Sequence, residues 1–386
     1  MNRALLFDIL RYGYLFFFTG LQTVLLLGVF LEWFRDRRSA RIPCPRHVKV
    51  SVIIPIRNES GRMRGLLRSL LIQDYPAEII FVDDCSADNS PAMLAEFVRD
   101  ARGKGLDNCR IITLKENPGP NNKQYALGRG IEEATGDFLL FTDGDCVVPQ
   151  GWIRAMASRI ADGRTGAIIG PVYKSRDRKG FFSLYQCFDH EVRFAYLAAA
   201  AGLGAAGGGF GNNIIINRKA LDESGGYEAV PPSPTEDAAL ISQIRSHGKY
   251  RIRAAILQDA AVKTASENSW KTLINQTLRW NNGGIFSPDI ITRFNYNFLM
   301  LLIAAGIFVI PFLPFFPGLW PGPLGIYFAL FENFIAATLI FHAKRPRGAA
   351  VLGYFFCVLF IPFYFTLMTF MGYFRIKVKW KEKTVK

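Results

Sequence analysis

Residues 137–145 read Asp-Phe-Leu-Leu-Phe-Thr-Asp-Gly-Asp, a short apolar run that ends in two carboxylates. An unbroken apolar run of this length is typical of a strand buried on both faces of a sheet. Working outward, three earlier runs rich in β-branched residues have the same form, at 50–56, 78–84 and 110–114. Stretches of helical character follow at about 62–73, 91–99 and 123–134. This alternation predicts an α/β fold with a mostly parallel sheet.

Polar residues gather at the ends of the predicted strands. They form three pairs: Asn58 and Glu59, Asp83 and Asp84, and Asp143 and Asp145. Ligands of open parallel sheets bind beyond the carboxyl ends of the strands. We therefore expect a single binding site at that rim of the sheet.

The pair Asp143 and Asp145 points to a metal. Two carboxylates one residue apart at a strand end can share a hard divalent cation, Mg²⁺ or Mn²⁺, which takes oxygen ligands and bridges to substrate phosphates. The alternative is an ordinary acidic turn at Gly144. The position behind a buried strand, next to two other polar strand ends, favours a metal–diphosphate site in which Asp143 also contacts the substrate.

Asp83 and Asp84 suit the nucleoside part of a ligand. A carboxylate there could accept the imide N–H of a uracil ring or bind ribose hydroxyls. The alternative is a solvated loop in which Ser86 or Asp88 caps the next helix. Both interpretations can hold together, because they use different residues.

Two further residues carry chemistry at predicted helix starts. The positive charge of Lys123 near a helix N-terminus interacts unfavourably with the helix dipole, and a bound phosphate would offset this unfavourable interaction. The alternative is an exposed lysine without a role. Asp237, in Thr235-Glu-Asp237, could be the general base that deprotonates an acceptor hydroxyl. The alternative for Asp237 is helix capping, with acidic residues favoured in the first turn.

Gln276, Arg279 and Trp280 share one face of a predicted helix just before a membrane block. Trp280 could stack on a sugar or acceptor, and Arg279 could hold diphosphate charge. The alternative is an interfacial helix with Trp and Arg at the level of the lipid headgroups.

Taken in order, these segments are far more specific than any one of them: Pro55-Ile-Arg-Asn-Glu59, Asp83-Asp-Cys-Ser86, Lys123, Asp143-Gly-Asp145, Gly211-Asn-Asn213, Thr235-Glu-Asp237 and Gln276-x-x-Arg279-Trp280. Their order and spacing resemble the family 2 glycosyltransferases, particularly the membrane-bound members. The resemblance covers about residues 49–288. It implies a GT-A fold, which is a Rossmann-like α/β arrangement with a mostly parallel sheet.

The resemblance also implies roles. Asp83 or Asp84 would contact the nucleotide base, while Asp143 and Asp145 would hold ribose, diphosphate and metal. Asp237 would be the base of an inverting, single-displacement transfer. The complete set of expected substrate-binding residues is Pro55, Asn58, Glu59, Asp83, Asp84, Lys123, Asp143, Asn212, Asn213, Glu236, Gln276, Arg279 and Trp280.

One position departs from the family. Thr277 stands where the family often has Gln or Arg, which counts against processive polymer synthesis. The Gly/Ala-rich stretch 202–211 is either a mobile loop near the acceptor or a close-packed helix end, and the sequence leaves both open.

Apolar blocks lie at both ends of the chain. Residues 12–31 carry no charge and match the roughly 20 apolar residues that cross a bilayer. A cleaved signal peptide is the competing interpretation, but no small-residue cleavage site precedes the arginines that follow. Three more blocks lie at 298–316, 324–341 and 349–374. Glu332, inside the block 324–341, either hydrogen-bonds to a neighbouring helix or belongs to an acceptor site.

Basic clusters flank the blocks: Arg35, Arg37, Arg38, Arg41, Arg46 and Lys49, then Lys344, Arg345 and Arg347, then Arg375, Lys377, Lys379, Lys381, Lys383 and Lys386. Such clusters favour the cytoplasmic side, with the N-terminus outside. Four spans would put the basic C-terminal tail outside, against this rule. Either the last block is a re-entrant turn hinged near Pro362 or the rule fails for the tail. Four spans are preferred because spans are commoner.

The predicted division follows from these boundaries: an N-terminal transmembrane helix (1–34), a basic linker (35–48), a cytosolic catalytic domain (49–288), a C-terminal membrane domain (289–374) and a basic tail (375–386).

The net charge is +14, and the basic residues are concentrated beside the apolar blocks. The sequence has no stripe of basic residues interleaved with aromatic residues, so binding to nucleic acid is not expected. The six cysteines form no CxxC pair, so neither a zinc site nor a disulfide framework is expected.

Together these features predict a multi-pass enzyme of the cytoplasmic membrane with its catalytic domain in the cytoplasm. It would move a sugar from a nucleotide-sugar, expected to be a UDP-sugar, to a membrane lipid or lipid-linked acceptor, because residues 276–280 abut the bilayer entry at 298. The rival within enzymes is a processive polysaccharide synthase. The rival from another class is a catalytically inactive membrane scaffold.

Overall fold

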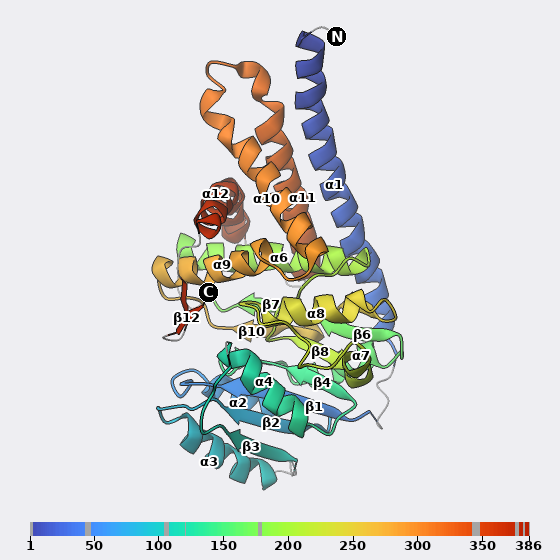
Figure 1. Cartoon of the computed structure of the whole chain (residues 1–386), viewed down its shortest axis with the longest axis vertical. Coiled ribbons are helices and arrows are strands. Elements are labelled where there is room, and N and C mark those ends of the chain that lie inside the picture. The colour runs from blue at the N-terminus through green and yellow to red at the C-terminus, as the bar shows by residue number, and fades with distance from the viewer. Residues whose placement is uncertain are drawn as a thin grey trace.

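The computed structural model describes residues 3–42, 48–103, 108–119, 121–176, 180–341, 348–374, 378–380 and 383–385. Figure 1 shows an α/β domain from which the helices α1 (Arg3–Ser39), α10 (Ile290–Phe308) and α11 (Pro321–Phe341) extend together in one direction. The expected helices between strands are present, with ends that differ by a few residues. The basic loop 344–347 and tail residues 375–377, 381–382 and 386 lie outside the described residues, as do residues 43–47 of the basic linker.

A seven-stranded sheet forms the centre of the domain. Its order is β3 (Cys109–Thr113), β2 (Glu78–Asp83), β1 (Val50–Ile56), β4 (Phe138–Phe141), β8 (Ile214–Asn217), β6 (Thr165–Ile169) and β9 (Arg251–Ala254). The first four strands pair in parallel, as do β6 and β9, whereas β8 is antiparallel to both of its neighbours. The expected α/β fold with a mostly parallel sheet is confirmed. A smaller sheet orders β5 (Cys146–Val147), β10 (Val262–Thr264) and β7 (Val172–Lys174).

Helices bury both faces of the sheet, because successive side chains of a strand point to opposite faces. On one face, Val52 and Ile54 of β1 lie in a core with α2 (Arg64–Leu70), α3 (Ser90–Arg102) and α5 (Trp152–Ile160). On the other, Ile53 lies in a core with α4 (Asn122–Glu133), α6 (Phe181–Gly202), α7 (Arg218–Glu223) and α8 (Glu236–Ser246). Both clusters are fully apolar, so the sheet is a rigid platform for its polar rim.

The N-terminal helix is anchored in the α/β domain by two buried acidic residues. Glu32 accepts from Arg253 Nε at 2.5 Å, and Asp36 accepts from Arg159 Nε at 2.5 Å. Asp36 also accepts the backbone N–H groups of Ile256 and Leu257, which follow β9, at 2.8 Å each. Helix α1 therefore continues beyond the predicted boundary at residue 34, and its last turns are part of the domain.

Three helices among the described residues are long and apolar enough to cross a membrane: Asp8–Ser39, Ile290–Phe312 and Gly353–Tyr373. The last lies within α12 (Gly348–Tyr373), and the block expected at 324–341 lies on α11. The remaining elements are α9 (Trp270–Ile285), the 3-10 turns Gln258–Ala260, Ile310–Phe312 and Pro317–Leu319, and the short strands β11 (Val378–Trp380) and β12 (Lys383–Val385).

Two open questions of the sequence have structural answers. Thr23 of α1 donates to Glu332 of α11 at 3.2 Å, so this carboxyl group has a hydrogen-bond partner on a neighbouring helix. The Gly/Ala-rich stretch is close-packed at its start: a Cβ added to Gly202 would lie 2.0 Å from the Gly28 carbonyl oxygen of α1. Glycine there allows the backbones of α6 and α1 to touch.

Candidate active site

A cavity of about 190 Å³ lies at the carboxyl ends of β1, β2 and β4. It brings together segments separated by more than 200 residues, from Pro55 to Trp280. Of the residues predicted for the site, those that line it are Pro55, Glu59, Asp84, Lys123, Asp143, Asp145, Asn212, Glu236, Asp237, Gln276, Arg279 and Trp280.

Three predicted residues lie outside the lining of this cavity, and their side chains hold the fold. Asn58, at a positive φ of 54°, accepts the Ala87 N–H at 2.8 Å. Asp83 is buried and accepts the Ser86 N–H at 3.2 Å. Asn213 is fully buried, accepts from the Trp152 indole at 2.9 Å, and donates to two backbone carbonyls. These contacts join neighbouring loops and leave Asp84 as the carboxylate of its pair that faces the cavity.

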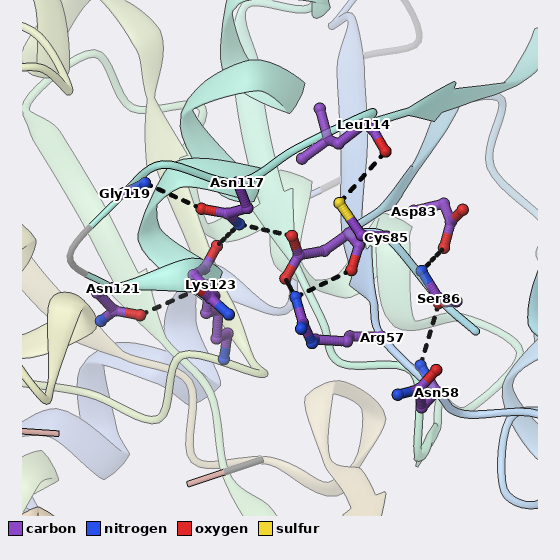
Figure 2. A network of polar contacts seen from close by, with 12 residues as sticks. Arg57, Asn58, Asp83, Cys85, Ser86, Leu114, Asn117, Gly119, Asn121 and Lys123 are labelled. Atoms are coloured by element: carbon purple, nitrogen blue, oxygen red, sulfur yellow. Dashed lines mark hydrogen bonds and ion pairs between the residues drawn. The ribbon is translucent and has the colours of Figure 1, made fainter. Parts of the chain in front are cut away.

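Asp84 is fixed by two polar side chains. Arg57 Nη1 donates to its Oδ2 at 3.0 Å, and Asn117 Nδ2 donates to its Oδ1 at 2.5 Å. Figure 2 shows Arg57 and Asn117 reaching this point from the ends of β1 and β3. The Cys85 thiol donates to the Leu114 carbonyl at 3.3 Å in the same network. The arrangement holds the Asp84 carboxylate in a fixed orientation in the lining of the cavity.

The carboxylates of Asp143 and Asp145 lie opposite two cations. Lys123 Nζ is 2.8 Å from Asp143 Oδ1 and 3.4 Å from Glu236 Oε1, and Arg62 Nη1 is 3.6 Å from Asp145 Oδ2. Burial opposes the charge on Lys123, but the carboxylates of Asp143 and Glu236 outweigh it and raise its pKa. Asn121 caps α4 by accepting from the Lys123 N–H at 3.1 Å. Lys123 therefore ties the end of β4 to the start of α8.

The lining fits a divalent cation only together with a substrate. No cluster of three or more His, Cys, Asp or Glu suited to a metal occurs in the described ranges. Asp143 and Asp145 would supply two oxygen donors, and phosphate oxygens and water would complete the shell. Seven carboxylates and five Lys or Arg side chains line the cavity. Because negative charge is in excess, a diphosphate would need a cation beside it.

Asp237 lies in the first turn of α8, where its carboxylate is held by backbone donors. Oδ2 accepts the Gly211 N–H at 2.7 Å and Oδ1 accepts the Ala238 N–H at 2.8 Å. Burial, and next the negative charge of Glu236, raise the pKa of Asp237 to about 6, while Lys123 opposes this shift. A carboxylate with this pKa is ionised at neutral pH and more basic than an ordinary Asp, which suits a general base.

Helix α9 closes one side of the cavity with Gln276, Arg279 and Trp280. Gln276 donates to Glu267 at 3.1 Å, and Arg279 Nη1 donates to the Pro234 carbonyl at 3.2 Å. Trp280 contacts His190, with ring centroids 5.6 Å apart. Thr277, the position that departs from the family, is buried on another face of α9 and accepts from Tyr364 of α12 at 3.0 Å.

Sequence reasoning missed several lining residues, among them Arg57, Arg62, Lys174, His190, Thr264 and Glu267. Arg57 lies inside the quoted motif 55–59 and Arg62 follows it closely, so both could have been included on that ground. Lys174 on β7 and His190 on α6 belong to no motif. Burial lowers the pKa of both side chains, and Lys174 donates to the Ala265 carbonyl at 3.1 Å. Only the fold places these two groups at the site.

A second cavity, of about 290 Å³, begins where the first ends. Both are lined by Phe210, Thr235, Asp237 and Trp280. The second continues between the long helices and is lined mainly by apolar residues, among them Phe18 of α1, Leu299 of α10, Ile326 of α11 and Phe365 of α12. Asp237 thus stands at the junction of a polar cavity and an apolar one.

Comparison with protein families agrees with this geometry. Residues 51–225 match the model described as glycosyl transferase family 2. An N-acetylglucosaminyltransferase of Rhizobium meliloti is 29% identical over 280 residues, which are 69% of this chain and 60% of that protein. A beta-monoglucosyldiacylglycerol synthase of Trichormus variabilis is 23% identical over 309 residues, 74% of this chain and 62% of that protein. The chain therefore spans about three fifths of the length of these relatives.

The fold also has a solved counterpart. A mannosyltransferase from Pyrobaculum calidifontis, in complex with GDP-Man and Mn²⁺, aligns with a TM-score of 0.51 and 18% sequence identity. The alignment covers 94% of this chain and 99% of that one. The expected GT-A fold is confirmed.

Proposed function

Since residues 51–225 match the model of glycosyl transferase family 2, we propose that this protein transfers a sugar from a nucleoside-diphosphate donor to a membrane lipid, with Asp237 as the base. The observation that carries the proposal is the place of Asp237, where the carboxylate-lined cavity meets the apolar one. The polar cavity suits the donor, and the apolar cavity suits the chain of an acceptor lipid. The similarity to a beta-monoglucosyldiacylglycerol synthase supports a lipid acceptor.

In the proposed reaction, Asp237 removes the proton of an acceptor hydroxyl as its oxygen attacks the anomeric carbon. The bond between that carbon and the diphosphate oxygen breaks, and the configuration inverts because only one displacement occurs. Arg279 and Lys123 would stabilise the negative charge that develops on the leaving diphosphate. A Mg²⁺ or Mn²⁺ held by Asp143 and Asp145 would add Lewis-acid stabilisation of that diphosphate.

Donor recognition is assigned to the polar cavity. Asp84, oriented by Arg57 and Asn117, would face the nucleoside, and Asp143 would lie near ribose and diphosphate. Pro55, Glu59, Asn212, Glu236, Gln276 and Trp280 also line the cavity, and Trp280 lines the apolar cavity as well. A UDP-sugar is the donor we expect from the sequence.

The proposed membrane position follows from the long helices. The α/β domain would lie on the cytoplasmic side, because Arg35, Arg37 and Arg38 lie in the last turns of α1, at its domain end. The apolar lining of the second cavity also favours a single transfer to a lipid over a processive polysaccharide synthase, whose polar product would need hydrogen-bonding partners along its path.

The test is a screen of purified full-length protein against UDP- and GDP-sugars with membrane lipids as acceptors, with and without Mn²⁺ or Mg²⁺. We expect one donor to yield a lipid carrying a single sugar, and a chelator to abolish transfer. Asp237→Asn should keep donor affinity within about twofold and lower transfer by at least about 10³-fold, the loss expected when a reacting group acts as a unit. Retained transfer in Asp237→Asn contradicts the base assignment, and a polymeric product contradicts single transfer.

A further inference from the structure

Helix α12 lies across the domain-side ends of the other long helices, although it is long and apolar enough to be a span. With about 1.5 Å per residue, its 26 residues would extend roughly 39 Å, which exceeds the apolar thickness of a bilayer. Figure 1 shows α1, α10 and α11 running the length of the helical region, while α12 is seen nearly end-on beside α6 and α9. Composition alone therefore does not determine its orientation.

Contacts along α12 hold it against α6 and α9, the helices that cover the α/β domain. Near its start, Tyr354 donates to Glu191 of α6 at 3.3 Å. In its middle, Tyr364 donates to Thr277 of α9 at 3.0 Å. At its end, a Cβ added to Gly372 would lie 2.8 Å from Ile285, the last residue of α9. Both ends and the centre of α12 thus contact helices that cover the α/β domain, and a helix that crossed the bilayer could not keep all three contacts.

Helix α11, by contrast, runs beside the N-terminal part of α1. Arg11 donates to the Gly318 carbonyl in the turn before α11 at 2.9 Å, and Thr23 donates to Glu332 at 3.2 Å. Residues 318–332 therefore lie beside residues 11–23 of α1 and run in the same direction. Wherever α1 crosses a bilayer, α11 crosses beside it, and α10 with α11 forms a hairpin that returns the chain to the domain side.

The outward face of α12 is apolar along its length. Phe356, Phe363 and Phe370 follow one another at seven-residue intervals and are 54%, 46% and 49% exposed. Seven residues are two turns, so these rings lie on one stripe of the helix. Basic residues flank the stripe in the sequence, at 344–347 before it and at 375–386 after it. The strand β11 of this tail contacts α9, on the domain side.

We propose that α12 is an interfacial helix that lies flat in the cytoplasmic leaflet, and that the C-terminus stays on the same side as the α/β domain. The partner surface is an anionic lipid leaflet: the Phe stripe enters the acyl region, and the positive charge of the flanking sequence favours anionic lipid. The chain then crosses three times, through α1, α10 and α11. The conflict between four spans and the charge of the tail disappears, because the tail never leaves the cytoplasmic side. This inference does not depend on the reaction proposed above.

The test measures depth and side separately. Phe356→Cys, Phe363→Cys and Phe370→Cys, each in full-length protein whose native cysteines are replaced, carry a nitroxide in vesicles that contain anionic lipid. A flat helix places the three labels at equal depth in the acyl region just below the headgroups, as judged by their accessibility to oxygen and to a water-soluble nickel complex. A spanning helix puts the label at 363 about 10 Å deeper than the other two, since seven residues rise roughly that far, and this result overturns the proposal.

A second measurement keeps the native cysteines, so it can be made even if the cysteine-substituted protein does not fold. An epitope tag follows Lys386 in the unaltered chain, and protease is added to intact cells or to inverted membrane vesicles. We expect the tag to be protected in cells and lost in inverted vesicles, together with exposed loops of the α/β domain. A tag cleaved in intact cells places the tail outside and overturns the proposal.

Discussion

The Gly211 N–H donates to Asp237 Oδ2 at 2.7 Å, so the backbone of one loop orients the carboxylate proposed as the base. The contact is tight. A Cβ on residue 211 would lie 3.1 Å from that same oxygen and 3.2 Å from the Asp237 Cβ. A larger residue at 211 would press on the Asp237 side chain, which would have to move by a few tenths of an ångström to keep this bond.

Gly211→Ala should therefore act on catalysis and spare donor binding. We expect the added methyl group to displace the Asp237 carboxylate by a few tenths of an ångström and to lower transfer by about 10–100-fold, in line with the sensitivity of reaction rates to small misplacements. Gly103→Ala, at the end of α3, meets only an ordinary contact at 3.5 Å and serves as the control. Equal transfer rates in the two variants would refute the orienting role of Gly211.

The pKa of Asp237 predicts how transfer depends on pH. Burial and Glu236 raise this pKa to about 6, and the base must be ionised to accept a proton. We expect kcat/KM to be flat near neutral pH and to fall with decreasing pH below about 6, where the protonated fraction grows. In Glu236→Gln, one negative neighbour is gone, so the pKa of Asp237 should drop and the acid limb should move to lower pH. An acid limb that stays in place would show that another group titrates.

We expect Lys123 to contribute both to donor affinity and to the stability of the fold. Its Nζ lies between Asp143 and the buried Glu236, and Lys123→Met would leave the Glu236 carboxylate without that partner. Removing one member of a buried pair typically costs about 3–5 kcal/mol, so we expect a lower Tm and a donor affinity weaker by at least tenfold. Lys219→Met, which breaks an exposed contact of 4.0 Å to Glu223, should change neither quantity. The prediction is wrong if both variants have the Tm of the unaltered protein.

Asp36 predicts how firmly α1 is attached. Asp36→Ala would remove the buried partner of Arg159 and leave the Ile256 and Leu257 amides without an acceptor. We expect a loss of several kcal/mol in stability, seen as a marked fall of Tm in detergent. Asp8→Ala, on the same helix, breaks an exposed pair with Arg11 and should shift the Tm by a degree or less. Similar melting of the two variants would show that α1 is only loosely attached.

Much of the rim could be predicted from sequence because it is built from strand ends. Asp143-Gly-Asp145 directly follows a strand whose apolar run is unambiguous, and the same local rule applies to Asp84 after β2. Such positions need only the periodicity of nearby residues and the rule that ligands bind at carboxyl ends.

Other parts of the site depend on contacts between distant segments. Lys174 and His190 both line the cavity because α6 packs on β7, which no local pattern encodes. The same holds for Glu32 and Asp36, which lie at the end of an apolar stretch and find their arginine partners more than 100 residues away. Asn58, Asp83 and Asn213 illustrate the converse. They occupy the expected motifs, but their side chains hydrogen-bond within the protein, Asn58 and Asp83 to backbone N–H groups of the loop after β2 and Asn213 to Trp152 and two backbone carbonyls.

The two ion pairs near the C-terminal end of α1 bear on which acceptors can react. Because Glu32 and Asp36 are locked to the strand-end region after β9, the α/β domain cannot tilt freely toward or away from the bilayer that α1 would cross. Asp237 then keeps a constant height above the lipid headgroups. We expect acceptors to be chosen in part by reach: a hydroxyl borne too close to the glycerol level, or too far out on a long polar headgroup, would miss the carboxylate even if its chemistry were suitable.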